Sequence, residues 1–243
     1  MFRSSGIAAC LSSIALTMAA LSPPASAIDF VPPDRGRPGS REGAGTRRGP
    51  VAEDRCSYRG DRPLTALMPN TNLGLTADPY PTFFFYIPET DARMVEFFIE
   101  AEVEDGTGQK RYEEIYRTRI EITGEARTIA LELPAAAGLA PLEEGREHYW
   151  SLMLLCTPQR EIAYVDGWVE RVAPPASLRS ALESATAAER PSLYAEAGLW
   201  YDTLEALAEL QQADPTDPNW QRDWANLLES VGLESLADAS ANP

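Results

Sequence analysis

Apolar and polar residues alternate along several stretches between residues 64 and 172, which is the pattern of strands that bury one face. The segment 94–103 places apolar and acidic side chains on opposite faces: Val95, Phe97, Ile99, Ala101 and Val103 against Glu96, Glu100 and Glu102. The segment 112–122 alternates similarly and aligns one set of side chains: Tyr112, Tyr116, Ile120 and Ile122. The run 83–87 is apolar on both faces, which predicts a central strand.

Further strands are expected at 64–68, 127–133, 149–156 and 163–172, which gives about seven short strands joined by turn-rich connections. This number and spacing favour an antiparallel β-sandwich of immunoglobulin or fibronectin type III character over residues 63–173. His148 stands where such domains usually carry a corner tyrosine, so we expect a structural hydrogen-bonding role for it. A sandwich serves many unrelated functions and by itself assigns none.

The hydrophobic period changes from 2 to about 3.6 residues after Pro174, which predicts a helical region over 174–243. A first helix ends near Pro191, and two helices separated by a turn at Gly198 follow. This pair resembles one helix-turn-helix unit of the tetratricopeptide type. A last helix begins at Asp217-Pro218 and carries an apolar stripe: Trp220, Trp224, Leu227, Leu228 and Val231.

The first 27 residues have the features of a secretory signal peptide. Arg3 precedes an apolar stretch, and Ala25-Ser26-Ala27 offers a cleavage site. The apolar stretch is short for a membrane span, so the mature chain would begin at Ile28 and contain no transmembrane segment. Lipidation at Cys10 is the alternative, although the apolar run continues past that residue. We therefore expect export to the periplasm, the cell envelope or the extracellular space.

Charge is distributed unevenly in a chain with 21 basic and 37 acidic residues. The segment 28–62 is rich in Gly, Pro and Arg and poor in large apolar residues, so we expect a disordered linker there. From residue 63 onward acids outnumber bases strongly. Because this acidic body would repel a phosphate backbone, we expect no nucleic-acid partner.

Two cysteines, Cys56 and Cys156, remain after removal of the signal peptide. In an oxidising compartment such a pair most simply forms a disulfide. The bond would fasten the end of the linker to the strand that contains Cys156.

No motif for catalysis, cofactor binding or metal binding is recognisable. His148 is the single histidine, whereas a structural zinc site needs about four Cys or His ligands. The sequence contains no Gly-x-Ser-x-Gly elbow and no phosphate-binding glycine loop. Acidic pairs such as Glu113/Glu114 and Glu143/Glu144 are explained by solvated faces more simply than by a hydrolase. We expect neither an enzyme nor a cofactor.

Aromatic residues are the remaining candidates for a binding site. Trp150 is expected in the core, and Trp168 follows Gly167, where the missing side chain would leave the ring accessible. Four rings of the helical region are candidates for a groove that binds a peptide or a sugar: Trp200, Tyr201, Trp220 and Trp224. The alternative is that these rings pack the helices onto the sandwich.

Several landmarks follow one another along the mature chain: Arg35-Gly36-Arg37-Pro38-Gly39, Cys56, Leu64-Thr65-Ala66-Leu67-Met68-Pro69, Trp150 with Cys156, Gly167-Trp168-Val169 and Gly198-Leu199-Trp200-Tyr201-Asp202. In this order they resemble the cyanobacterial exported family catalogued as domain of unknown function 928. The resemblance implies an envelope protein with no assigned activity or catalytic residues.

Together these features predict an exported, non-enzymatic binding or protein-interaction module, with an envelope protein or a glycan as its partner. A carbohydrate-binding domain that uses exposed tryptophans is the alternative. A hydrolase ranks last, because it would need two carboxylates facing each other across a cleft.

Overall fold

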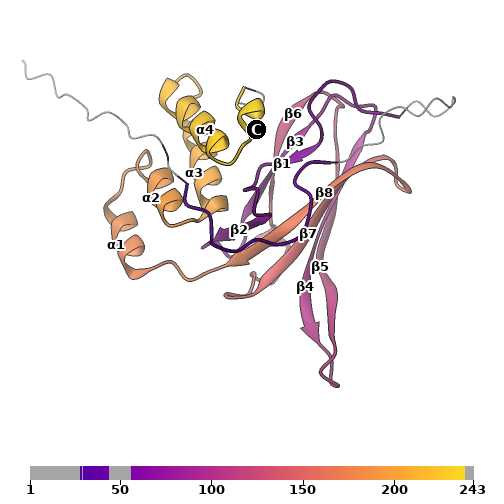
Figure 1. The fold of residues 1–243 in the computed structure, drawn as a ribbon, viewed down its shortest axis with the longest axis horizontal. Helices are drawn as coiled ribbons and strands as arrows, with labels where there is room; N and C mark the ends of the chain where they lie inside the picture. The colour runs from indigo at the N-terminus through magenta and orange to yellow at the C-terminus, as the bar shows by residue number, and fades with distance from the viewer. Residues whose placement is uncertain (1–27, 29, 44–55, 239–243) are drawn as a thin grey trace, which may run out of the picture.

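The computed structural model describes residues 28, 30–43 and 56–238. Within these residues, two β-sheets of three and five strands are followed by four α-helices (Figure 1). The protein is therefore mainly β with a C-terminal helical region, as the hydrophobic pattern predicts. The signal peptide expected at residues 1–27 lies outside the described part of the chain.

The smaller sheet contains three strands in the order β1 (Thr65–Ala66), β3 (Thr82–Ile87) and β6 (Arg127–Glu132). Both of its strand pairs are antiparallel. Every residue of β3 is buried, which confirms the central position predicted from its apolar faces.

The larger sheet contains five strands in the order β2 (Leu73–Thr76), β8 (Arg160–Arg171), β7 (Glu147–Thr157), β4 (Met94–Glu104) and β5 (Lys110–Glu121). Three of its pairs are antiparallel, whereas β2 and β8 are parallel. The expectation of a wholly antiparallel sandwich is wrong at this pair, because β2 joins the last strand of the sheet without a hairpin.

The core lies between the sheets and continues beneath the helices. Val95, Phe97 and Ile99 of β4 are fully buried, which confirms the predicted alternation of that strand. Trp150 of β7 is buried opposite Gly167 of β8. A Cβ atom at Gly167 would lie 2.6 Å from the Trp150 ring. The glycine therefore makes room for this core tryptophan, whereas from the sequence it was expected to make Trp168 accessible.

Four helices lie beside the sheets: α1 (Ala176–Ser184), α2 (Arg190–Glu196), α3 (Trp200–Ala213) and α4 (Pro218–Ser230). Helix α4 begins where the sequence predicts, because the Asp217 carboxylate accepts a hydrogen bond from the Asn219 N–H at 2.9 Å. Two short 3-10 helices complete the structure: η1 (Ala135–Ala137) and η2 (Glu234–Leu236). None of the helices in the described part is long and apolar enough to cross a membrane.

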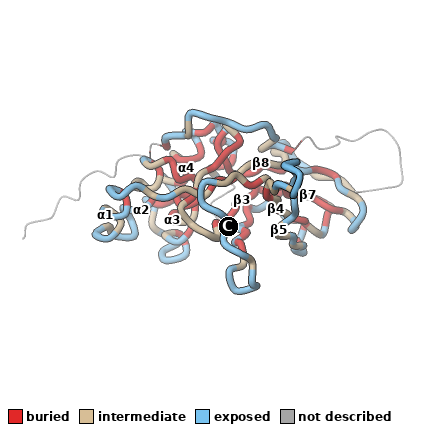
Figure 2. Tube along the Cα trace, turned by 90° about the horizontal axis from the view of Figure 1, so that it is seen from below, coloured by how far each residue is buried: buried red, intermediate tan, exposed pale blue. Residues whose placement is uncertain are grey.

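Helix α3 fastens the helical region to the sheets. Its first residue, Trp200, is fully buried and donates from Nε1 to the Leu67 carbonyl at 2.8 Å. The next residue, Tyr201, accepts a hydrogen bond from Trp150 Nε1 at 3.1 Å. Buried positions therefore run without interruption from the strands into α3 and α4 (Figure 2).

Residues 30–43, here called the N-terminal arm, lie against this body and depart from the disordered linker predicted for 28–62. Phe30 is buried, and its ring meets that of Trp200 edge to face, with centroids 4.8 Å apart. Farther along, the Gly43 N–H donates to the Leu64 carbonyl at 2.7 Å. Disorder was predicted because the segment has few large apolar side chains. The arm is nevertheless held in place by a few buried side chains and by backbone hydrogen bonds.

Cys56 and Cys156 form a disulfide with Cα atoms 6.0 Å apart, which confirms the predicted pair. Cys156 lies near the end of β7. The bond therefore fixes the chain that enters the smaller sheet to a strand of the larger one.

Candidate functional site

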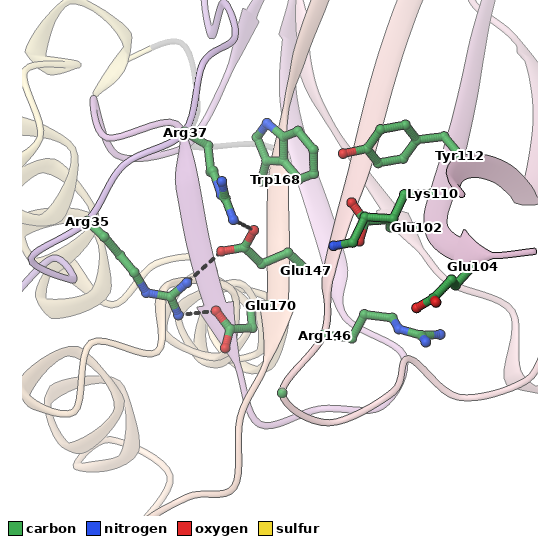
Figure 3. A pocket seen from close by; sticks show the side chains of 11 residues that line it. Arg35, Arg37, Glu102, Glu104, Lys110, Tyr112, Arg146, Glu147, Trp168 and Glu170 are labelled. Atoms are coloured by element: carbon green, nitrogen blue, oxygen red, sulfur yellow. Dashed lines mark hydrogen bonds and ion pairs between the residues drawn. The ribbon is translucent and has the colours of Figure 1, made fainter. Parts of the chain in front are cut away.

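One end of the five-stranded sheet carries a cavity of about 600 Å³, here called the sheet-end pocket (Figure 3). Its walls come from the arm, from the β4–β5 hairpin, and from the neighbouring ends of β7 and β8. The lining residues are Arg35, Arg37, Glu102, Glu104, Lys110, Tyr112, Gly145, Arg146, Glu147, Trp168 and Glu170.

A β-bulge brings Tyr112 into the pocket. Ile99 of β4 lies opposite Tyr116 of β5, but the register then shifts and Glu102 lies opposite Tyr112. One extra residue on β5 reverses the faces of all positions beyond it. Tyr112 therefore leaves the face that simple alternation assigns to it together with Tyr116, and its ring is 51% exposed.

Trp168 is the centre of a small aromatic cluster at the pocket. Its ring centroid lies 5.4 Å from that of Tyr149 and 6.0 Å from that of Tyr112. Its indole N–H donates to the Pro38 carbonyl at 2.9 Å. The guanidinium carbon of Arg37 lies 5.5 Å from the Trp168 centroid, within the range of a cation–π contact.

Two arginines of the arm meet two glutamates of the sheet. Arg35 Nη1 lies 2.5 Å from a Glu147 carboxylate oxygen, and Arg35 Nη2 donates to Glu170. Arg37 donates to the second oxygen of Glu147. Glu147 and Glu170 lie directly opposite each other on β7 and β8. Since like charges at opposed positions destabilise a sheet, the arginines relieve a repulsion that the strand pairing creates.

The facing wall belongs mainly to the β4–β5 hairpin. Lys110 Nζ donates a hydrogen bond to a Glu102 oxygen at 2.6 Å, and this bond raises the pKa of Lys110. The pocket lining as a whole is balanced between bases and acids: Arg35, Arg37, Lys110 and Arg146 against Glu102, Glu104, Glu147 and Glu170.

Tyr149 lies behind Trp168 and supports it. Burial, followed by the charge of Asp166, raises the pKa of Tyr149 to about 12. Asp166 also accepts a hydrogen bond from the Ser40 N–H of the arm at 2.9 Å. Tyr149 therefore stays protonated at neutral pH, and it can act as a hydrogen-bonding group but not as a base.

Of the five aromatic residues proposed from the sequence as a binding surface, only Trp168 lines this pocket. The other four are buried: Trp200, Tyr201, Trp220 and Trp224. The rings of Trp224 and Phe84 pack with centroids 6.0 Å apart, so α4 contacts the smaller sheet through this tryptophan. These four rings are packing residues in the structure and do not line an accessible groove.

His148 contributes no chemistry to the pocket. It is buried on the core face of β7, opposite Ala101, and burial lowers its pKa. Its Nδ1 atom has no hydrogen-bond partner within the described residues, so the expected structural hydrogen bond is not made by this atom. In the same part of the chain, no group of three or more His, Cys, Asp or Glu side chains is arranged to hold a metal ion.

Two carboxylates lie away from the pocket, where α3 meets the sheets: Asp202 is buried and Glu205 is half-buried. Asp202 accepts a hydrogen bond from the Ala77 N–H at 3.1 Å, and burial raises the pKa of Asp202 to about 6. Glu205 accepts from the Thr82 hydroxyl at 2.7 Å, and burial raises the pKa of Glu205 to about 7. Both carboxyl groups therefore favour the protonated form more than they would in water.

Of the residues that line the pocket, sequence reasoning proposed only Trp168 as a binding residue. Arg35 and Arg37 were assigned to a linker, although their spacing of two residues in an extended segment would place both on one side. Tyr112 was assigned to the wrong face, and the break in strict alternation at Glu113-Glu114-Ile115-Tyr116 is the local signal of the bulge that moves it.

A family model described as Domain of Unknown Function (DUF928) matches residues 42–241, which confirms the resemblance drawn from the ordered landmarks. The matched region includes Glu147, Trp168 and Glu170 and begins after Arg35 and Arg37. A comparison with curated proteins finds none that matches the chain.

Proposed function

The chain belongs to the family described as Domain of Unknown Function (DUF928), and because that description assigns no activity, we propose from the site itself that the protein is a non-enzymatic binding module. Its ligand occupies the sheet-end pocket. The module acts in the periplasm or cell envelope, since residues 1–27 have signal-peptide features. The Cys56–Cys156 bond is compatible with an oxidising compartment.

The observation that carries this proposal is a pocket in which aromatic rings adjoin charges that already pair with one another. Trp168 and Tyr112 supply ring surface, while Lys110 pairs with Glu102 and Arg35 with Glu147. Guanidinium and carboxylate groups keep spare donors and acceptors after forming such pairs. A lining of balanced charge therefore favours a polar ligand of low net charge.

The same pairing argues against a hydrolase built on facing carboxylates. The two glutamates of the pocket that lie opposite each other in register, Glu147 and Glu170, are bridged by Arg35. A carboxylate pair that shares a guanidinium is poorly placed to exchange protons with a substrate.

A carbohydrate is the second, more specific candidate for the ligand, and Trp168 is the observation that favours it. A sugar ring can lay its C–H face on an indole while vicinal hydroxyls bond to planar groups such as guanidinium and carboxylate. Trp168 lies beside both kinds of group in Arg37 and Glu147. This candidate keeps the carbohydrate alternative, which allowed for tryptophans of the sandwich or of the helices, and assigns it to Trp168 of the sandwich.

The fold supports a closer comparison with immunoglobulin-like domains. The orders β1-β3-β6 and β2-β8-β7-β4-β5 correspond to strands A-B-E on one sheet and G-F-C-C′ on the other, with β2 as a split first strand. We also propose that α2 and α3, joined through Gly198 at φ +73°, form a tetratricopeptide-like pair. Superposing an experimental structure on both folds would test these assignments.

The ligand proposal can be tested with the mature chain and a panel of neutral, uronic-acid and amino-sugar oligosaccharides together with short peptides. A ligand of the pocket would raise the thermal unfolding temperature of the wild type, and Trp168→Ala would abolish that rise. Tyr164→Ala is the matched control, because this tyrosine lies on the same strand, is 49% exposed, and does not line the pocket. Equal ligand effects in the two variants would refute the assignment.

A further inference from the structure

Glu147 and Glu170 require a cation between them. They face each other on antiparallel strands, and their side chains are only 14% and 11% exposed. Two opposed carboxylates that are largely shielded from water repel each other strongly. In the structure Arg35 bridges the two, and Arg37 binds the remaining oxygen of Glu147 (Figure 3).

Trp168 contacts the same part of the arm through different chemistry. Its N–H donates to the Pro38 carbonyl, and its ring lies beside the Arg37 guanidinium. The hydrogen bond to Pro38 is independent of the carboxylates, whereas the Arg37 guanidinium contacts both the Trp168 ring and Glu147. Glu147, Glu170 and Trp168 together bind two guanidinium groups, separated by one residue, and the main-chain carbonyl that follows them. A segment with the sequence Arg-Xaa-Arg carries these groups.

The arm is anchored on both sides of these arginines. Phe30 packs on Trp200 before them, and Ser40 exchanges two hydrogen bonds with Asp166 after them. Between the anchors, the side chains of Arg35 and Arg37 remain 50% and 45% exposed. Because both guanidinium groups remain open to solvent on one side, a competing guanidinium can reach the two carboxylates and replace the arginines while the anchors hold.

We propose that Glu147, Glu170 and Trp168 form a receptor site for an arginine-bearing peptide segment of a partner protein. Arg35 and Arg37 occupy this site in cis until the partner displaces them. Since a tethered segment acts at a high effective concentration, only a segment that outcompetes the arm is admitted. The site shares a wall with the pocket of the proposed function, and the inference rests on that function only for its location.

The test uses the peptide acetyl-Arg-Gly-Arg-amide as the probe and the Arg35→Ala/Arg37→Ala double variant as the vacated receptor. We expect the double variant to bind the probe at least tenfold more tightly than the wild type, whose site is filled in cis. Acetyl-Lys-Gly-Lys-amide is the matched probe and should bind several-fold more weakly, because lysine lacks the planar fork of arginine. Isothermal titration gives the affinities, and the Trp168 indole N–H resonance reports the location.

Adding Glu147→Gln and Glu170→Gln to the double variant should abolish binding of the probe. Equal affinities of wild type and double variant, or binding that survives the glutamine substitutions, would overturn the proposal. The Glu147→Gln/Glu170→Gln variant of the otherwise native chain gives a second route if the alanine variant does not fold. It should be cleaved by trypsin after Arg35 at least tenfold faster than the wild type, and an unchanged rate would equally overturn the proposal.

These outcomes are separable from the fate of the proposed function. A panel of oligosaccharides and peptides that fails to stabilise the protein leaves the affinity for the Arg-Gly-Arg probe unaffected. Conversely, a pocket ligand found with the panel would stand even if the probe does not bind.

Discussion

Replacing Asp202 by Asn should change how stability depends on pH, because this carboxyl is buried where the first turn of α3 meets the sheets. Burial raises the pKa of Asp202 from 3.8 to about 6, although hydrogen bonds from Ala77 and Thr76 act in the opposite direction. In the unfolded chain the same group titrates near its ordinary value. Between these two values the folded protein holds a proton that the unfolded chain has released. Stability therefore falls as pH rises through this range.

The magnitude follows from the two pKa values. A rise from 3.8 to about 6 corresponds to about 3 kcal/mol of unfolding free energy. This contribution is fully present below the lower value and is lost as pH rises through the upper one. Asn keeps one oxygen to accept the Ala77 N–H but cannot ionise. The stability of Asp202→Asn relative to wild type should therefore increase by about 2–3 kcal/mol between about pH 4 and about pH 8.

Urea unfolding at a series of pH values between these limits measures the difference. Glu229→Gln is the matched control, because Glu229 is exposed on α4, and it should change stability by less than about 0.5 kcal/mol at each pH. A difference between Asp202→Asn and wild type that is the same at both ends of the series would refute the reasoning. The carboxyl would then not experience the burial that the structure gives it.

Three further predictions concern stability and processing. Trp200→Ala should cost about 3–5 kcal/mol in urea unfolding, because it removes a buried ring and its hydrogen bond to Leu67; a loss no greater than that of the exposed control Tyr164→Ala would contradict this. Cys156→Ser should lower stability by up to about 4–5 kcal/mol, because it opens a link between residues 100 apart in sequence; thiol counts that are equal with and without reductant would disprove the bond. Expression of the full chain in a Gram-negative host should yield periplasmic protein whose N-terminal sequence begins at Ile28, whereas a cytoplasmic chain that retains Met1 would contradict export.

The strands were predictable because burial on one face leaves a period of two in the sequence. Val95, Phe97 and Ile99 followed that period and are buried. The face of Tyr112 was not predicted in the same way, since the bulge at β5 inserts a residue where Glu113-Glu114 and Ile115-Tyr116 interrupt strict alternation. An error of one residue in register moved this tyrosine from the core to the pocket.

The arm was mispredicted for a different reason. Composition reports how much apolar surface a segment can bury, and by that measure residues 28–62 cannot fold alone. The arm is instead ordered by contacts with the rest of the protein. Phe30 packs on Trp200, and Arg35 pairs with two glutamates that are more than 100 residues away in sequence. Such long-range partners leave no mark in the local sequence, and for this reason the two arginines that the arm contributes to the charged wall of the pocket were not predicted.

The sheet-end pocket as the ligand site is best tested by following the tryptophan indole N–H groups in ¹H–¹⁵N NMR spectra while the oligosaccharide and peptide panel is added. Trp168 lines the pocket, and the other tryptophans are buried and serve as internal references: Trp150, Trp200, Trp220 and Trp224. We predict that at least one compound shifts the Trp168 resonance and leaves the reference resonances in place. A Trp168 resonance that does not move with any compound, or that moves only together with the buried tryptophans, would contradict the assignment.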